Sequence, residues 1–156
     1  MIKSDVLRRV RYILDFGDSK MIEIFALGGL KVSRAKLSQW LKRDDDPDYE
    51  CCTDIQLASF LNGLINEKRG KKEGEQPKAE SVLTNNIILR KLMIAYNLRT
   101  EEVLDVLKLA NLRVSKHELS AFFRRPEHKN YRECKAQILR NFLIGLQKKE
   151  REEVSK

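Results

Sequence analysis

The sequence contains no apolar run that approaches the roughly 18 residues a membrane-spanning helix requires. Cysteine is scarce as well: Cys51, Cys52 and Cys134 are an odd number, at spacings that make no disulfide framework. The N-terminal segment does not read as a secretory signal, because Arg8 and Arg9 interrupt its apolar residues and no small-residue cleavage site follows. We therefore expect a cytoplasmic protein with reduced thiols and no membrane contact.

The sequence also lacks the short motifs of common enzymes: it has no P-loop, no Gly-rich dinucleotide turn, no HExxH and no paired CxxC. Asp44, Asp46 and Asp48 have the spacing that opens a calcium-binding loop. However, Tyr49 stands where such a loop needs glycine, and Ile55 where it needs glutamate, so a solvated acidic turn is the preferred interpretation. With no nucleophile beside a base, we predict that the protein is not an enzyme and holds no cofactor or metal.

An internal repeat is the main feature that the sequence does contain. VSRAKLSQWLKR begins at Val32 and VSKHELSAFFRR at Val114, 82 positions later. Over residues 7–149 this shift needs no gap and leaves 16 of 61 aligned positions identical. Most of the identical positions are apolar or belong to turns, so the repeat mainly preserves a core.

The repeat divides the chain into two homologous units, residues 1–68 and 82–149. Residues 69–81 are rich in Gly, Pro and alternating charge, which predicts a linker, and residues 150–156 are expected to fray. Each unit has the apolar spacing of four helices, and no segment alternates with period two. We therefore predict an all-α protein of two tandem four-helix units packed with pseudo-two-fold symmetry. Units this small gain stability by burying surface against each other or in a homodimer.

The third predicted helix of each unit resembles the second half of a helix-turn-helix motif. In the second unit Ser115 caps the helix, and Leu119 and Phe122 face the preceding helix. The first half of the motif fits poorly, because Arg113 stands where the tight turn usually has glycine. The turn is instead predicted to use Asn111, which, like the glycine at the equivalent place in the first unit, tolerates a left-handed conformation.

The net charge of +8 lies almost entirely in the second unit. Residues 1–68 contain 11 basic and 11 acidic residues, whereas residues 82–149 contain 14 and six. The loop after the third helix reads KRDDDPDY in the first unit and RRPEHKNY in the second. A basic surface is typical of proteins that contact nucleic-acid phosphates. The alternative is a protein-interaction adaptor or oligomer whose basic half binds an acidic protein surface, such as a DDDPD loop.

The outer face of the third helix of the second unit and the loop after it supply the candidate nucleic-acid-binding residues. Polar side chains there can contact phosphates or base edges, although solubility alone also places polar residues on an outer face. The candidates are Lys116, His117, Ser120, Arg124, Arg125, His128, Lys129, Arg132 and Lys135.

Three stretches of the sequence, IQLASFLNGL, LRVSKHELSAFFRRPEHKNYREC and QILRNFLIGL, resemble the YehS-like family of small bacterial proteins. The resemblance spans nearly the whole chain and both repeats. It implies a bacterial cytosolic protein built of two tandem copies of a domain of unknown function, and it brings no catalytic residues. Together with the charge, it leads us to predict a non-enzymatic protein that binds nucleic acid or regulates through its second unit.

Overall fold

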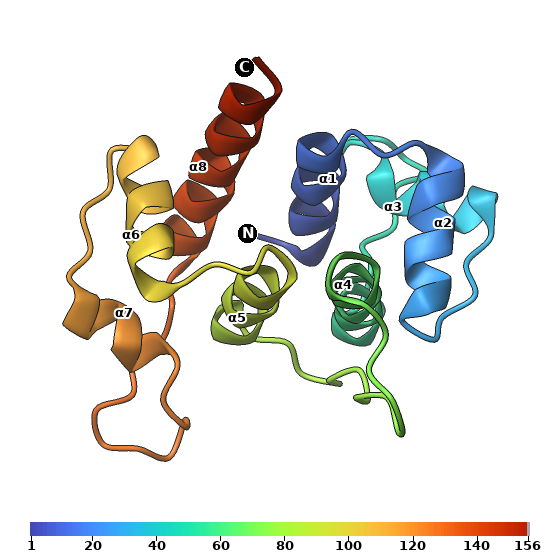
Figure 1. The fold of residues 1–156 in the computed structure, drawn as a ribbon. Helices are drawn as coiled ribbons and strands as arrows, with labels where there is room; N and C mark the ends of the chain where they lie inside the picture. The colour runs from blue at the N-terminus through green and yellow to red at the C-terminus, as the bar shows by residue number, and fades with distance from the viewer. Residues whose placement is uncertain (156) are drawn as a thin grey trace. The chain divides into compact units, whose positions relative to one another are not determined.

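The structure, a computed structural model, describes residues 1–155. This part of the chain contains eight α-helices and no strand, which confirms the prediction of an all-α protein (Figure 1). It divides into two compact units, Met1–Leu83 and the chain from Thr84 onward. The helices are α1 (Lys3–Leu14), α2 (Asp18–Leu27), α3 (Arg34–Leu41) and α4 (Asp54–Arg69) in the first unit, and α5 (Asn85–Ala95), α6 (Thr100–Leu109), α7 (Lys116–Phe122) and α8 (Ala136–Ser155) in the second.

In each unit the second helix packs closely on the fourth (Figure 1). A glycine on the fourth helix permits this contact. A Cβ added to Gly63 of α4 would lie 1.8 Å from the backbone oxygen of Ile24 on α2. A Cβ added to the equivalent Gly145 of α8 would lie 1.9 Å from the backbone oxygen of Val106 on α6. Because both distances are far below van der Waals contact, only glycine fits at these crossings.

The core of the first unit is built on three aromatic rings. The ring of Phe25 lies 5.0 Å from that of Phe60 and 5.5 Å from that of Trp40, centroid to centroid, and all three side chains are buried. The second unit has Leu107 at the place of Phe25, and Phe122 at the place of Trp40. Each unit therefore has its own apolar core with the same plan and different side chains.

The turn before the third helix has the backbone conformation that the sequence predicts. Gly29 has φ of 88° and the equivalent Asn111 has φ of 61°, both in the left-handed region. The N–H of Leu30 donates to the Phe25 oxygen, and the N–H of Leu112 to the Leu107 oxygen, both at 3.0 Å. These six-residue closures end α2 and α6 and direct the chain into α3 and α7.

The segments that follow the fourth helix of each unit were expected to be a linker, residues 69–81, and a tail, residues 150–156. The N–H of Leu83, just past the expected linker, donates to the Asp54 carboxylate at 2.8 Å, so this end of the segment is fastened to the first unit. Residues 150–156 were expected to fray, yet α8 continues to Ser155.

Candidate nucleic-acid interface

Helix α7 is short and well capped. The Ser115 hydroxyl accepts from the N–H of Glu118 at 3.0 Å and lies 3.3 Å from its carboxylate, to which it donates. Leu119 and Phe122 are buried, as the sequence predicts. The remaining face of α7 is left to the polar residues Lys116, His117 and Ser120, which are all exposed.

The loop after α7 is held by one buried side chain, Asn86 of α5. Its amide oxygen accepts from the N–H of Cys134 at 2.9 Å. Its amide nitrogen donates to the carbonyl oxygens of Phe122 and Arg132 at 3.0 and 2.8 Å. The N–H of Arg132 also donates to the Ala121 oxygen at 3.2 Å. Both ends of the loop are thus fixed to the unit, and its basic side chains project from a defined backbone.

The structure divides the nine candidate residues by what they already contact. Lys116 pairs with Glu101, and Lys135 with Glu133, each at 3.2 Å, so both carry a local counter-charge. The remaining candidates from the loop fall into two groups. Arg124 and His128 form hydrogen bonds within the loop. Arg124 donates to the Asn130 oxygen at 3.1 Å, and the His128 Nδ1 accepts from the Asn130 N–H at 3.0 Å.

The second group from the loop consists of Arg125, Lys129 and Arg132. All three are exposed, and none of them forms an ion pair within the described part of the chain. Uncompensated, exposed cations of this kind are available for contacts with phosphate groups.

A hollow of about 260 Å³ lies between the start of α5 and the end of α7. It has an apolar lining with basic residues among it. The lining residues are Thr84, Asn86, Ile87, Arg90, Phe122, Phe123, Arg124, Arg125, Pro126 and Tyr131. We refer to it as the α5–α7 pocket. The structure therefore brings Arg124 and Arg125 to one site, whereas Lys116, His117 and Ser120 do not line it.

Sequence reasoning missed Arg90 as a site residue. Arg90 is exposed and joins Arg124 and Arg125 in the pocket lining. One signal could have identified it: Arg8 and Arg90 are identical in the repeat, although most identities are apolar or belong to turns. An arginine kept at equivalent places in both copies indicates a shared position for a guanidinium group.

The equivalent place in the first unit is occupied by an internal ion cluster. Arg8 donates to the carboxylate of Asp5 and pairs with Asp44 at 2.9 Å. It also donates to the Lys42 oxygen, and its guanidinium lies 5.8 Å from the ring centroid of Tyr49. Partial burial lowers the pKa of Arg8, but the hydrogen bonds with the two carboxylates outweigh it, so the pKa is raised.

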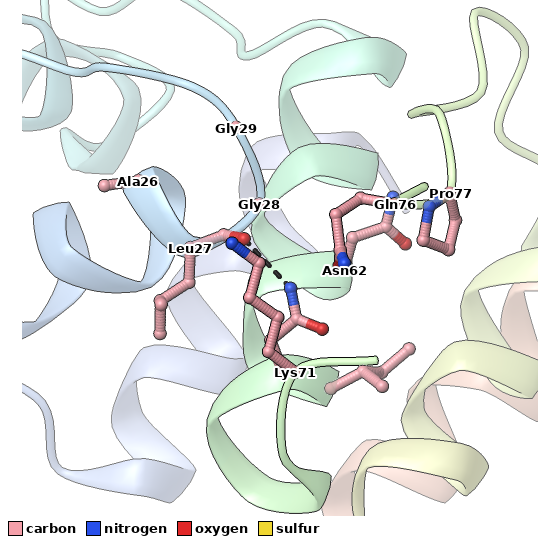
Figure 2. A pocket seen from close by; sticks show the side chains of 10 residues that line it. Ala26, Leu27, Gly28, Gly29, Asn62, Lys71, Gln76 and Pro77 are labelled. Atoms are coloured by element: carbon pink, nitrogen blue, oxygen red, sulfur yellow. Dashed lines mark hydrogen bonds between the residues drawn. The ribbon is translucent and has the colours of Figure 1, made fainter. Parts of the chain in front are cut away.

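A second hollow, of about 170 Å³, lies where the linker passes α2 and α4 in the first unit (Figure 2). Asn66 donates to the Leu27 oxygen at 2.9 Å, and Gln76 and Pro77 cover one side. Lys71 is its one ionisable lining residue. Its other polar lining residues are the amides of Asn62, Asn66 and Gln76.

Cys52 and Cys134 occupy equivalent buried places. Burial raises the pKa of the Cys52 thiol to about 11 and that of Cys134 to about 12, so both are neutral thiols at pH 7. Over the described residues, no three His, Cys, Asp or Glu side chains gather to hold a metal ion. None of the described helices combines the length and apolarity needed to cross a membrane.

Comparison with known proteins agrees with the tandem architecture. A protein-family model described as "Protein of unknown function (DUF1456)" matches the chain twice, over residues 4–70 and 85–152. The chain is 45% identical over 147 residues to the "Uncharacterized protein YehS" of Escherichia coli (strain K12), and the match covers 94% of each protein. No solved structure matches it. The chain therefore belongs to the DUF1456 family and carries two copies of the family's domain.

Proposed function

We propose that the chain is a non-enzymatic nucleic-acid-binding protein of the bacterial cytoplasm that grips phosphates with its second unit. The observation that supports this most is the group of exposed cations on the loop after α7. Arg125, Lys129 and Arg132 have no acidic partner among residues 1–152, and the loop that presents them is fastened at both ends. Fixed, unpaired cations release counterions from a phosphate backbone with little cost in loop ordering.

The first unit supplies the contrast that supports this assignment. Two of its equivalents of the second unit's basic residues are matched by carboxylates. Arg8, the equivalent of Arg90, pairs with Asp44. Arg43, the equivalent of Arg125, pairs with Asp45. Because these pairs neutralise the surface, the first unit offers little to a polyanion. Cations are paired in one copy of the fold and unpaired in the other. This difference favours a binding function for the unpaired charge over a role in solubility alone.

The test is a titration of labelled duplex DNA, single-stranded DNA and RNA with the full chain at several salt concentrations. Wild type is compared with Arg124→Glu/Arg125→Glu and with the matched first-unit variant Lys42→Glu/Arg43→Glu. These pairs occupy equivalent places in the repeat and carry the same change of charge. We expect a steep dependence of affinity on salt, and a slope reduced by about two in the second-unit variant only.

Two results would contradict the proposal. One is the absence of binding near physiological salt for all three nucleic acids. The other is an equal loss in the two charge-reversal variants, since net charge and not the second unit would then govern binding. Either result would favour the alternative in which the basic half docks on an acidic protein surface, and a search for such a partner would follow.

A further inference from the structure

The α5–α7 pocket differs from the rest of the basic surface in one respect: it combines cations with aromatic side chains. Arg90, Arg124 and Arg125 lie in its lining together with Phe123 and Tyr131. The two aromatic residues are half-buried, which leaves part of each ring accessible. A surface that only gathers phosphates needs no such rings, so the pocket is suited to a more specific ligand.

The first unit indicates what chemical group the arginine of this pocket receives. Arg8, the equivalent of Arg90, lies near Tyr49 and holds two carboxylates. In the second unit the arginine and the tyrosine are both present, as Arg90 and Tyr131. The two carboxylates are absent from the second unit, because Ile87 stands at the place of Asp5 and Pro126 at the place of Asp44.

The exchange of acidic for apolar side chains leaves the Arg90 guanidinium unpaired in the part of the chain that the structure describes, and places apolar groups beside it. Arg90 has no acidic partner within the described residues, so an oxyanion from outside the chain can take the place that Asp44 has in the first unit. Ile87 and Pro126 add apolar surface beside it, which favours a flat, unsolvated group next to that oxyanion.

We infer that the α5–α7 pocket receives one unpaired nucleotide of a single-stranded nucleic acid. The base would lie against the aromatic and apolar lining, and Arg90 with Arg125 would hold its phosphate. A nucleotide carries an oxyanion and a planar ring within one residue of the polymer, which is the combination that the lining presents. In a duplex the bases are stacked and unavailable, so the pocket selects single strands.

The size of the pocket agrees with one residue of a polymer. Its volume of about 260 Å³ lies just below the range of roughly 300–1,000 Å³ that is usual for drug-sized ligands. A volume of this order is enough for one planar base. This inference rests on the proposed nucleic-acid binding and adds to it the class of nucleic acid and the residues that choose it.

The experiment compares three labelled probes at one salt concentration with the full chain: a 12-residue single strand, an abasic strand of the same length, and a duplex. The abasic strand has the same phosphates and no bases, so it isolates the contribution of the rings. We expect wild type to bind the base-containing strand about tenfold more tightly than the abasic one.

Three variants assign that difference to the pocket. Arg90→Gln should weaken binding of the base-containing strand about tenfold. Arg140→Gln removes the same charge from an exposed position on α8 outside the pocket, and should weaken it less than about twofold. Phe123→Leu keeps every charge and should abolish the preference over the abasic strand. Circular dichroism checks that each variant is folded.

The outcomes separate this inference from the proposed function. Equal affinity for the base-containing and abasic strands, with Arg90→Gln no worse than Arg140→Gln, overturns the pocket assignment. The proposed function stands in that case if affinity still depends on salt and on Arg124 and Arg125. Failure of every strand to bind overturns both. Tighter, Arg90-dependent binding of an acidic DDDPD peptide also overturns the inference, because it would assign the pocket to a peptide carboxylate.

Discussion

The two units share one helical plan and differ in how they treat the same arginine. In the first unit Arg8 is satisfied by Asp5 and Asp44 of its own unit. In the second unit Arg90 lies in a hollow whose other lining residues are apolar, aromatic, polar or basic, with no carboxylate among them. The two units share the helical plan and the turn before the third helix, although their core side chains differ. The exchange of two acidic side chains for apolar ones at the surface therefore separates an internal ion cluster from an open pocket.

A second difference concerns how each unit fixes the loop that follows its third helix. Ser4 of α1 accepts one hydrogen bond, from the N–H of Cys52 at 3.0 Å. The equivalent Asn86 accepts the same bond from Cys134 and donates two more, to Phe122 and Arg132. The loop that carries unpaired positive charge is therefore held by more bonds, while the loop of the first unit is held partly by the ion pairs of Arg8.

The largest difference in stability between the two units is expected for a substitution at Gly28. A Cβ there would lie 1.7 Å from the backbone oxygen of Ser59, so Gly28→Ala must push α2 away from α4. We expect a loss of about 3 kcal/mol or more in the free energy of unfolding of the first unit. The second unit carries Ala110 at this place, so its helices already admit a methyl group.

Chemical denaturation followed by the fluorescence of Trp40 measures this loss, because Trp40 is the one tryptophan in the sequence and lies in the core of the first unit. The control is Ala110→Gly, which should cost the second unit at most about 1 kcal/mol through backbone entropy, as measured by unit-resolved hydrogen exchange. A Gly28→Ala protein as stable as wild type would contradict the close approach of the two helices.

The next effect tests the hydrogen bonds that fix the two loops. Asn86→Ala removes three bonds and leaves the Cys134 N–H and two carbonyls buried, so we expect a loss of about 3 kcal/mol in the second unit. Ser4→Ala removes one bond and should cost about 1–2 kcal/mol in the first. Hydrogen exchange, resolved by unit, measures both losses.

The variant Asn86→Ser, which places the residue of the first unit in the second, serves as the intermediate case. It can restore the bond to Cys134 but not both donations, so its stability should lie between those of wild type and Asn86→Ala. Equal losses in Ser4→Ala and Asn86→Ala would mean that the two added bonds do not stabilise the loop.

The sequence predicts the parts of the fold that depend on local chemistry. The four helices of each unit follow from apolar spacing, and the left-handed turn from Gly29 and Asn111. It also assigns the excess charge to the second unit. These features depend on near neighbours in the chain, which a single sequence displays.

The features that escaped prediction depend on residues far apart in the chain. Arg90 meets Arg124 and Arg125 only when α5 lies beside the end of α7. The need for glycine at 63 and 145 arises from the approach of the preceding helix pair, not from a turn. Spacing along the chain does not contain this information, because it is set by tertiary packing.

A pH effect of intermediate size compares the buried thiols. The folded pKa values of about 11 for Cys52 and about 12 for Cys134 both lie above the ordinary value of 9.0. Above about pH 9 the unfolded chain therefore releases thiol protons that the folded chain keeps, and stability falls as pH rises. Below that pH neither thiol contributes.

Each thiol should cost about 1 kcal/mol per pH unit within its window. Cys52→Ala and Cys134→Ala should each reduce the slope of the free energy of unfolding against pH, measured by urea denaturation between about pH 9 and pH 12. The slope due to Cys134 should persist to a higher pH than that due to Cys52. Slopes identical to wild type in both variants would show that the thiols are not buried as described.

The smallest expected effect bears most directly on the two arginines. Arg8→Gln leaves Asp5 and Asp44 without their cation, and since the cluster is partly exposed we expect a loss of about 1 kcal/mol in the first unit, reduced at high salt. Arg90→Gln removes an arginine with no acidic partner in the described structure, so the stability of the second unit should change by less than about 0.3 kcal/mol. Trp40 fluorescence and unit-resolved hydrogen exchange measure the two losses.

Equal destabilisation would mean that Arg90 has a structural role of its own, and would contradict the inference that its guanidinium binds a ligand. A stable Arg90→Gln protein that has lost affinity for single strands would instead separate the two arginines by function. Arg8 would stabilise the fold by pairing with carboxylates of its own unit, and Arg90 would pair with an anion only when a ligand binds.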